Sequence, residues 1–286
     1  MASDCRFAVL IDADNVSVKY IKIILDEISK DGVATYKRIY GDWTNPSLIS
    51  WKSALLDNSI IPIQQYSYTT GKNSTDSAMI IDAMDILYSG QVEGFCLVSS
   101  DSDFTRLASR LRESGMTVIG MGESKTPNSF IAACNKFKYL DILSAADEEE
   151  PEETQKPEPS KKTPQQKKAP ARKTASQKKA KEDPKPEKEQ KPAPVQKQQK
   201  DIEEPRTSLR TIRRALRTIV RENSDEDNWI IIGKVGNILD KRYPDFDVRN
   251  FGFSKLTPFL DSLDMFEIKS ERKDNNSSPQ MYVRLK

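Results

Sequence analysis

The chain has 286 residues, of which 45 are basic and 43 acidic, so its formal net charge is only +2. It contains no histidine, which excludes Ser/His and Cys/His nucleophile pairs, histidine general bases and the commonest zinc ligands. The three cysteines lack a Cys-x-x-Cys spacing, so they indicate neither a disulfide framework nor a zinc knuckle and favour a reducing, cytoplasmic setting. We expect no signal peptide and no membrane span, because no apolar stretch approaches about 18 residues.

Composition divides the chain into three parts, at residues 1–145, 146–205 and 206–286. The first part has 17 acidic and 14 basic residues, whereas the last has 12 acidic and 16 basic residues. The middle part is rich in Lys, Glu, Gln, Pro and Ala and has almost no large apolar residue. Such a composition cannot bury a core, so we expect a disordered, charged linker between two folded domains.

The first domain alternates strand and helix signals, which predicts an α/β fold with a parallel sheet and helices on both faces. Strand-like runs occur at residues 6–11, 35–40, 60–64, 94–98 and 117–121. Helical patterns lie between or after them at about residues 16–30, 46–57, 75–89, 103–114 and 127–133.

Two of these apolar strands run directly into polar residues. "FAVLIDADN" ends in Asp12 and Asn15, and "FCLVSSDSDF" ends in Ser100, Asp101 and Asp103. In open parallel sheets, ligands gather beyond the carboxyl ends of the strands, where the strand order reverses. We therefore expect these side chains to meet at one rim of the sheet.

The stretch "GKNSTDSAMIIDAMDIL" supplies a third acid, Asp76, in the first turn of a predicted helix, with Asp82 as a less favoured supporting candidate. Carboxylates grouped without histidine or cysteine suit Mg²⁺ or Mn²⁺, which can promote phosphodiester hydrolysis. The simpler interpretation is that Asp14 and Asp103 cap the helices that follow the strands.

At these residues the sequence resembles the NYN domain of the LabA and DUF88 type, a branch of the PIN-like nucleases. The matching stretches are "LIDADN", "STDSAMIIDAMD" and "LVSSDSDFTRLASRLRESGMTVIGMG". The resemblance implies a metal-dependent ribonuclease fold, with Asp12, Asp76 and Asp101 at the acidic positions, joined by Asp103 and by Asn15 as a polar partner. Ala13 departs from the pattern, since many relatives have glycine there.

Two other functions stay open at this point. "DADNV" also fits the Asp-x-Asp-x-Val pattern of haloacid-dehalogenase-type phosphatases, in which Asp12 would be the nucleophile and Asp14 the acid and base. The second alternative is a catalytically inactive RNA-binding or adaptor protein.

The C-terminal part predicts a small winged helix-turn-helix. "TSLRTIRRALRTIVREN" forms an amphipathic helix rich in arginine, and a short strand at 230–232 and a helix over about 233–242 follow. We expect one longer helix from about Val248 to Leu263, and then two strands, "MFEIKS" and "QMYVRLK".

The stretch "NWIIIGKVGNILDKRYPDFDVRNFGFSKLTPFLDSL" resembles the LOTUS or OST-HTH domain. This resemblance implies binding of RNA or of a protein partner such as a helicase. Basic residues near the third helix and the wing are the RNA-binding candidates, namely Arg249, Lys255, Arg272 and Lys273. We expect the aromatic residues of this domain to belong to its core, namely Tyr243, Phe246, Phe251, Phe253 and Phe266.

Together these features predict an endoribonuclease that acts on single-stranded RNA and uses Mg²⁺ or Mn²⁺, with RNA recruited by the winged helix. A homodimer of the first domain stays open, and no membrane partner is expected.

Overall fold

The computed structural model describes residues 5–66, 74–148, 207–272 and 279–286. The predicted linker lies almost entirely outside these residues. Within the described part of the chain, no helix is long and apolar enough to cross a membrane.

The N-terminal domain is built on a six-stranded parallel sheet with the order β3-β2-β1-β4-β5-β6. All five predicted strands are present, and a sixth strand, β6, was not predicted. The strands are β1 (Arg6–Asp12), β2 (Val33–Gly41), β3 (Ile61–Gln64), β4 (Gly94–Val98), β5 (Thr117–Gly122) and β6 (Lys136–Tyr139).

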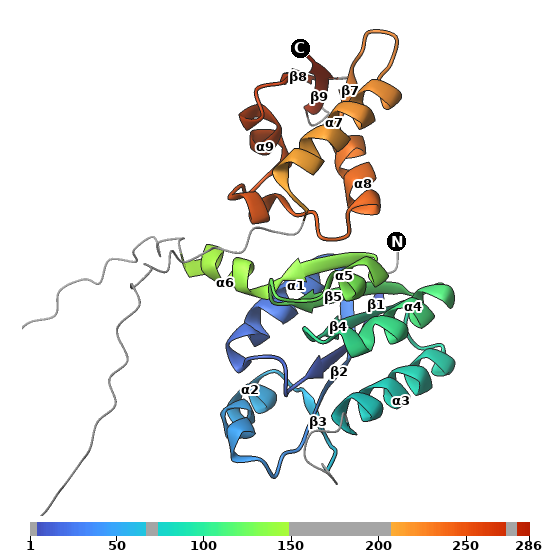
Figure 1. Cartoon of the computed structure of the whole chain (residues 1–286), viewed down its shortest axis with the longest axis vertical. Coiled ribbons are helices and arrows are strands. Elements are labelled where there is room, and N and C mark those ends of the chain that lie inside the picture. Colours follow the sequence, from blue (N-terminus) through green and yellow to red (C-terminus); the bar gives the residue numbers. More distant parts are fainter. Residues whose placement is uncertain (1–4, 67–73, 149–206, 273–278) are drawn as a thin grey trace, which may run out of the picture. The chain divides into compact units, whose positions relative to one another are not determined.

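Helices cover both faces of this sheet, which confirms the predicted α/β fold (Figure 1). One face packs against α1 (Ile21–Asp31), α2 (Trp51–Asp57) and α6 (Leu140–Glu148). The other face packs against α3 (Ser74–Ser89), α4 (Thr105–Glu113) and α5 (Asn128–Ala133). Short 3-10 turns precede three of the helices, at η1 (Val18–Tyr20), η2 (Pro46–Ser50) and η3 (Ser102–Phe104).

Alternation along β1 explains why both faces are covered. Phe7, Val9 and Ile11 point into the core on the α1 side, whereas Ala8 and Leu10 point into the core on the α3 side. Successive side chains of a strand face opposite sides of its sheet, so a strand that is apolar at every position needs a helical layer on each side.

The strand order reverses between β1 and β4. From β1 the chain continues outward to β2 and β3, and it then returns to β4 on the other side of β1 before continuing to β5 and β6. Asp12 ends β1, and Ser99 follows the last residue of β4, so both lie at this switch point. The fold thus brings the two polar strand endings together, as the sequence predicted.

The C-terminal domain combines helices with a three-stranded antiparallel sheet of order β7-β9-β8. Its elements are α7 (Leu209–Asn223), β7 (Ile230–Ile231), α8 (Ile232–Arg242), η4 (Val248–Phe251), α9 (Leu256–Ser262), β8 (Phe266–Glu271) and β9 (Gln280–Leu285). The expectation of one continuous helix from Val248 to Leu263 is wrong. Gly252 adopts a left-handed conformation (φ 78°, ψ 21°) that ends η4, and α9 begins four residues later.

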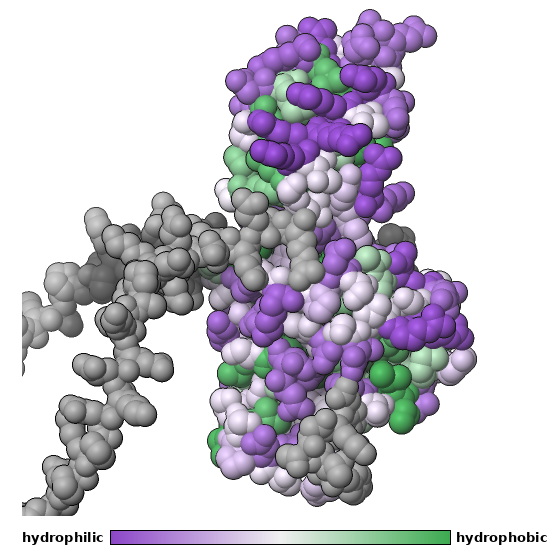
Figure 2. Space-filling view, in the orientation of Figure 1, coloured by the Kyte–Doolittle hydropathy of each residue, from purple (hydrophilic) through white to green (hydrophobic). Residues whose placement is uncertain are grey.

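The five aromatic residues predicted for the core lie in it or pack against it, namely Tyr243, Phe246, Phe251, Phe253 and Phe266. Phe259 is buried and contacts three other phenylalanine rings, those of Phe246, Phe251 and Phe253, at centroid distances of 5.2 to 5.9 Å. In contrast, the arginines of α7 are exposed, and the face of this domain seen in Figure 2 is largely hydrophilic. These are Arg210, Arg213, Arg214, Arg217 and Arg221.

Candidate active site

Asp12 is buried at the end of β1, with only 1% of its surface exposed, and both its carboxylate oxygens accept hydrogen bonds. Oδ1 accepts from the backbone N–H groups of Asp14 (3.0 Å) and Asn15 (3.3 Å). Oδ2 accepts from Asn15 Nδ2 (2.7 Å) and Ser99 Oγ (2.7 Å). Burial raises the pKa of Asp12, while the bonds from Asn15 and Ser99 lower it, and the net shift is upward.

The loop after β4 is shaped by side-chain bonds to its own backbone. Ser99 Oγ accepts from the Asp101 N–H (3.1 Å), and Asp101 Oδ1 accepts from the Asp103 N–H (2.9 Å), which caps η3. Ser100 Oγ accepts from the Glu123 N–H (2.9 Å), which fixes the loop to the end of β5. The carboxylates of this loop are therefore held by short local turns rather than by flexible chain.

Asp76 enters the same region from the first turn of α3 and is 9% exposed. Burial, followed by the nearby charges of Asp12, Asp101 and Asp103, raises the pKa of Asp76 to about 6. Like charges that crowd one carboxyl group disfavour its ionised form. A bound cation would relieve the part of this pKa shift that comes from the neighbouring carboxylates.

Three carboxylates are close enough to share a metal ion. Asp76, Asp101 and Asp103 each offer one oxygen, and these oxygens lie within 4.8 Å of one another. Hard oxygen donors of this kind fit Mg²⁺ or Mn²⁺, and the raised pKa of Asp76 supports that fit. Asp12 does not belong to this group of three, although its charge contributes to the raised pKa of Asp76.

The other acidic candidates lie elsewhere or have other tasks. Asp82, two turns along α3, accepts hydrogen bonds from Arg38 and the Tyr40 hydroxyl of β2 and is outside the group of three. Asp14 is exposed, and its backbone N–H donates to Asp12 in the turn after β1. The side-chain cap of η3 is Asp101, not Asp103 as the capping interpretation had it.

Ser99 is the residue that the sequence interpretation missed. It is fully buried, and its single hydroxyl donates to Asp12 and accepts from the Asp101 N–H, which connects the two strand endings. A serine between an apolar strand and an Asp-rich loop gives no sign of this role. The signal becomes visible only when β1 and β4 are known to be neighbours, as they are in the sheet.

The cationic candidates of the C-terminal domain differ in exposure. Lys255, immediately before α9, and Arg272, after β8, are exposed. Arg249 is half-buried, and its guanidinium pairs with Asp247 (2.6 Å). Lys273 lies outside the described residues. Their role in RNA binding stays a prediction.

Two stretches of the chain match family models of known proteins. Residues 6–141 match the family model "NYN domain", and residues 206–278 match "OST-HTH/LOTUS domain". No curated protein matches the chain. A crystal structure of a protein of unknown function from Vibrio parahaemolyticus RIMD 2210633 is similar at 18% identity, covering 49% of this chain and 96% of that chain with a TM-score of 0.42.

Proposed function

Because the chain joins an NYN domain to an OST-HTH/LOTUS domain, we propose that it is a metal-dependent endoribonuclease that cuts single-stranded RNA. The observation that carries this proposal is the group of three carboxylates, Asp76, Asp101 and Asp103, at the switch point of the sheet. We take residues 1–145 as the catalytic domain, 146–205 as the tether and 206–286 as the RNA-recruiting domain. The three free cysteines fit a reducing, cytoplasmic setting.

Mg²⁺ or Mn²⁺ would be held by Asp76, Asp101 and Asp103. Such an ion supplies an activated water and neutralises charge that develops on the phosphate during hydrolysis. Asp103 is exposed and Asp101 is half-buried, so the group is accessible to a polymer from solvent.

Asp12 and its partners would position this group rather than form a covalent bond to substrate. Both oxygens of Asp12 already accept hydrogen bonds, and its side chain is buried, so its negative charge acts through space on the neighbouring acids. A phosphatase of the Asp-x-Asp type needs Asp12 as an accessible nucleophile. The observed burial of Asp12 therefore favours the nuclease over the phosphatase.

RNA recruitment would fall to the C-terminal domain, because clustered acids repel a phosphate backbone. Lys255, Arg272 and the exposed arginines of α7 provide positive charge for phosphate contacts. A tether keeps RNA bound to this domain at a high local concentration near the carboxylates.

The test uses an internally labelled single-stranded RNA, with Mn²⁺ or Mg²⁺, and two matched variants. Asp101→Asn removes one carboxylate of the group, whereas Asp82→Asn removes an acid that pairs with Arg38 instead. We expect internal cleavage by the wild type and by Asp82→Asn, and a loss of about 100-fold or more in Asp101→Asn, because metal-ion stabilisation is worth several kcal/mol. Phosphomonoesters should release no phosphate.

Thermal unfolding separates the alternatives. Mn²⁺ should raise the melting temperature of the wild type and of Asp82→Asn but not that of Asp101→Asn. RNA that stays whole while it binds tightly would identify an inactive adaptor. Rapid phosphomonoester hydrolysis with a phosphoryl group trapped on Asp12 would identify a phosphatase.

A further inference from the structure

The outer edge of β6 contacts the C-terminal domain. β6 is the last strand in the sheet order, so among the described residues no further strand pairs with its outer side. The Phe137 N–H donates to the Pro244 carbonyl (2.7 Å), and the Tyr139 hydroxyl donates to Asp245 Oδ2 (3.2 Å). Tyr139 and Asp245 are both buried, with 1% and 5% of their surfaces exposed. The described residues within 1–150 and 203–286 accordingly belong to one compact unit.

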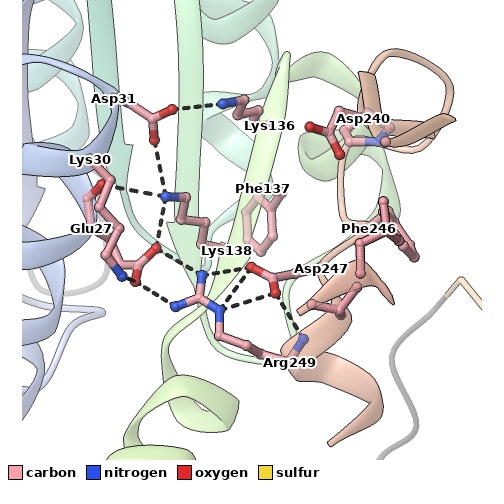
Figure 3. A pocket seen from close by; sticks show the side chains of 14 residues that line it. Glu27, Lys30, Asp31, Lys136, Phe137, Lys138, Asp240, Phe246, Asp247 and Arg249 are labelled. Carbon is pink, nitrogen blue, oxygen red and sulfur yellow. Dashed lines mark hydrogen bonds and ion pairs between the residues drawn. The ribbon is translucent and has the colours of Figure 1, made fainter. Parts of the chain in front are cut away.

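An ion pair lies beside these hydrogen bonds (Figure 3). Arg249 Nη1 and Nη2 bond to the two carboxylate oxygens of Glu27 at 2.6 and 2.9 Å. Glu27 belongs to α1, and its side chain is only 4% exposed. A two-pronged guanidinium–carboxylate contact fixes orientation as well as distance.

Glu27 is also held by cations of its own domain. Lys138 Nζ, from β6, lies 2.8 Å from Glu27 Oε2 and 3.0 Å from Asp31 Oδ2, and Lys30 Nζ lies 2.5 Å from Glu27 Oε1. Burial opposes the ionisation of Glu27, but the bonds from Arg249, Lys138 and Lys30 outweigh burial and lower its pKa. These residues line a pocket of about 340 Å³ together with Asp247 and Phe246.

The contacting segment, residues 244–249, is shaped by bonds within its own domain. Asp245 accepts from the Thr207 hydroxyl (2.5 Å) and N–H (3.2 Å), and Asn250 Nδ2 donates to the Asp245 carbonyl (2.9 Å). Asp247 caps η4 through the Arg249 N–H (2.9 Å). A segment that is already ordered loses little conformational entropy when it binds.

From these contacts we propose that the OST-HTH/LOTUS domain docks through residues 244–249 on the β6 edge of the NYN domain of the same chain. Two independent contacts identify residues 244–249 as the segment that binds this edge. One is the backbone hydrogen bond from Phe137 to Pro244, and the other is the ion pair between Arg249 and Glu27. Docking also covers a strand edge, which is otherwise a site for pairing with another chain. While docked, the Arg249 guanidinium is paired with two carboxylates, those of Glu27 and Asp247.

Amide hydrogen exchange of the full chain tests the docking, because the Phe137 N–H donates to Pro244 of the other domain. Arg249→Glu should speed Phe137 exchange by about tenfold or more, since it leaves Glu27 facing a like charge. Arg249→Ala, which adds no charge beside Asp247, should act in the same direction. The matched control is Arg217→Glu, the same charge change at an exposed position of α7, which should leave Phe137 protected.

The control for folding is the Leu239 amide in α8. If this amide stays protected from exchange in a variant, the C-terminal domain of that variant is folded. Equal Phe137 exchange in the wild type and in both Arg249 variants would overturn the proposal. An unprotected Phe137 in the wild type would overturn it as well. Protection that increases with protein concentration would assign the contact to a second copy and rule out docking within one chain.

Discussion

At the scale of single residues, the site depends on a division of roles among its carboxylates. Asp12 is buried and accepts four hydrogen bonds, so it is fixed in place. Asp76, Asp101 and Asp103 lie close together, with Asp76 buried, Asp101 half-buried and Asp103 exposed, so the group of three reaches the surface. One buried acid with satisfied oxygens next to three crowded acids is an arrangement that stabilises a positive charge.

Ser99→Ala tests how the fixed acid is held. The substitution removes the hydroxyl that donates to the buried Asp12 carboxylate, and hydrogen bonds to charged groups contribute about 1.5–3 kcal/mol. We expect urea unfolding to show a loss of free energy of unfolding in that range. Ser100→Ala is the control, because Ser100 Oγ accepts from a neutral N–H and its removal should cost about 1 kcal/mol. Equal losses in the two variants would contradict the role of Ser99.

The raised pKa of Asp76 predicts a pH dependence without divalent ions. Its pKa rises from 3.8 to about 6 on folding, so the folded state binds this proton more tightly than the unfolded state. The resulting stabilisation is complete below about pH 4 and is lost as the pH rises through 6. Asp76→Asn should remove this component, so the free energy of unfolding of the wild type should fall more steeply than that of the variant between pH 4 and 6. If the free energies of unfolding of the wild type and of Asp76→Asn changed with pH in parallel, the raised pKa of Asp76 would be refuted.

The sequence predicted the acids of the site but not the bonds among them. Asp12, Asp76, Asp101 and Asp103 stand out because charged residues that end or flank apolar strands and helices need a reason to be there. Ser99 and the pairing of Asp82 with Arg38 depend on which strands are neighbours, and a single sequence does not contain that information.

At the scale of elements, the strands buried on both faces were the easiest to predict, because an apolar run bounded by polar residues leaves few alternatives. β6 was missed since "KFKY" is short and alternates lysines with aromatics, a pattern that fits an edge strand or an exposed loop equally well. The break between η4 and α9 was missed because the apolar positions of 248–263 keep a helical spacing across Gly252.

Gly252→Ala tests that break. Gly252 has a φ of 78°, and a Cβ placed there would meet no atom within 4 Å, so any effect reports the backbone conformation alone. We expect a loss of about 1 kcal/mol in the free energy of unfolding, since a left-handed residue with a side chain costs about 1–2 kcal/mol. Gly233→Ala in α8 is the control and should be neutral or stabilising by up to about 1 kcal/mol. Stabilisation by Gly252→Ala would favour the continuous helix instead.

At the scale of the whole molecule, each domain has its own hydrophobic core. The NYN sheet has one cluster on each face, and the OST-HTH/LOTUS helices enclose a third cluster centred on residues such as Leu216, Val235 and Phe259. Separate cores mean that each domain can retain its fold when the other is changed. The proposed docking joins the domains at the edge of β6.

Removal of residues 206–286 tests the proposed division of labour between these domains. The acidic NYN domain should keep slow, Mn²⁺-dependent cleavage of a short single strand, because the three carboxylates all belong to it. RNA affinity should fall, because the exposed cations of α7, Lys255 and Arg272 are removed. The slope of the logarithm of affinity against the logarithm of salt concentration should become shallower by about 0.7 for each phosphate that these cations neutralise.

An Asp101→Asn full chain is the converse control for this truncation, since it should bind RNA like the wild type but not cut it. Its C-terminal domain keeps every cation, whereas its group of three carboxylates is reduced to two. The truncated chain would then keep cleavage but bind RNA more weakly, whereas Asp101→Asn would keep RNA binding but lose cleavage. If residues 1–145 alone bound RNA as tightly as the full chain, the recruiting role of the C-terminal domain would be wrong, while the proposed carboxylate site would stand.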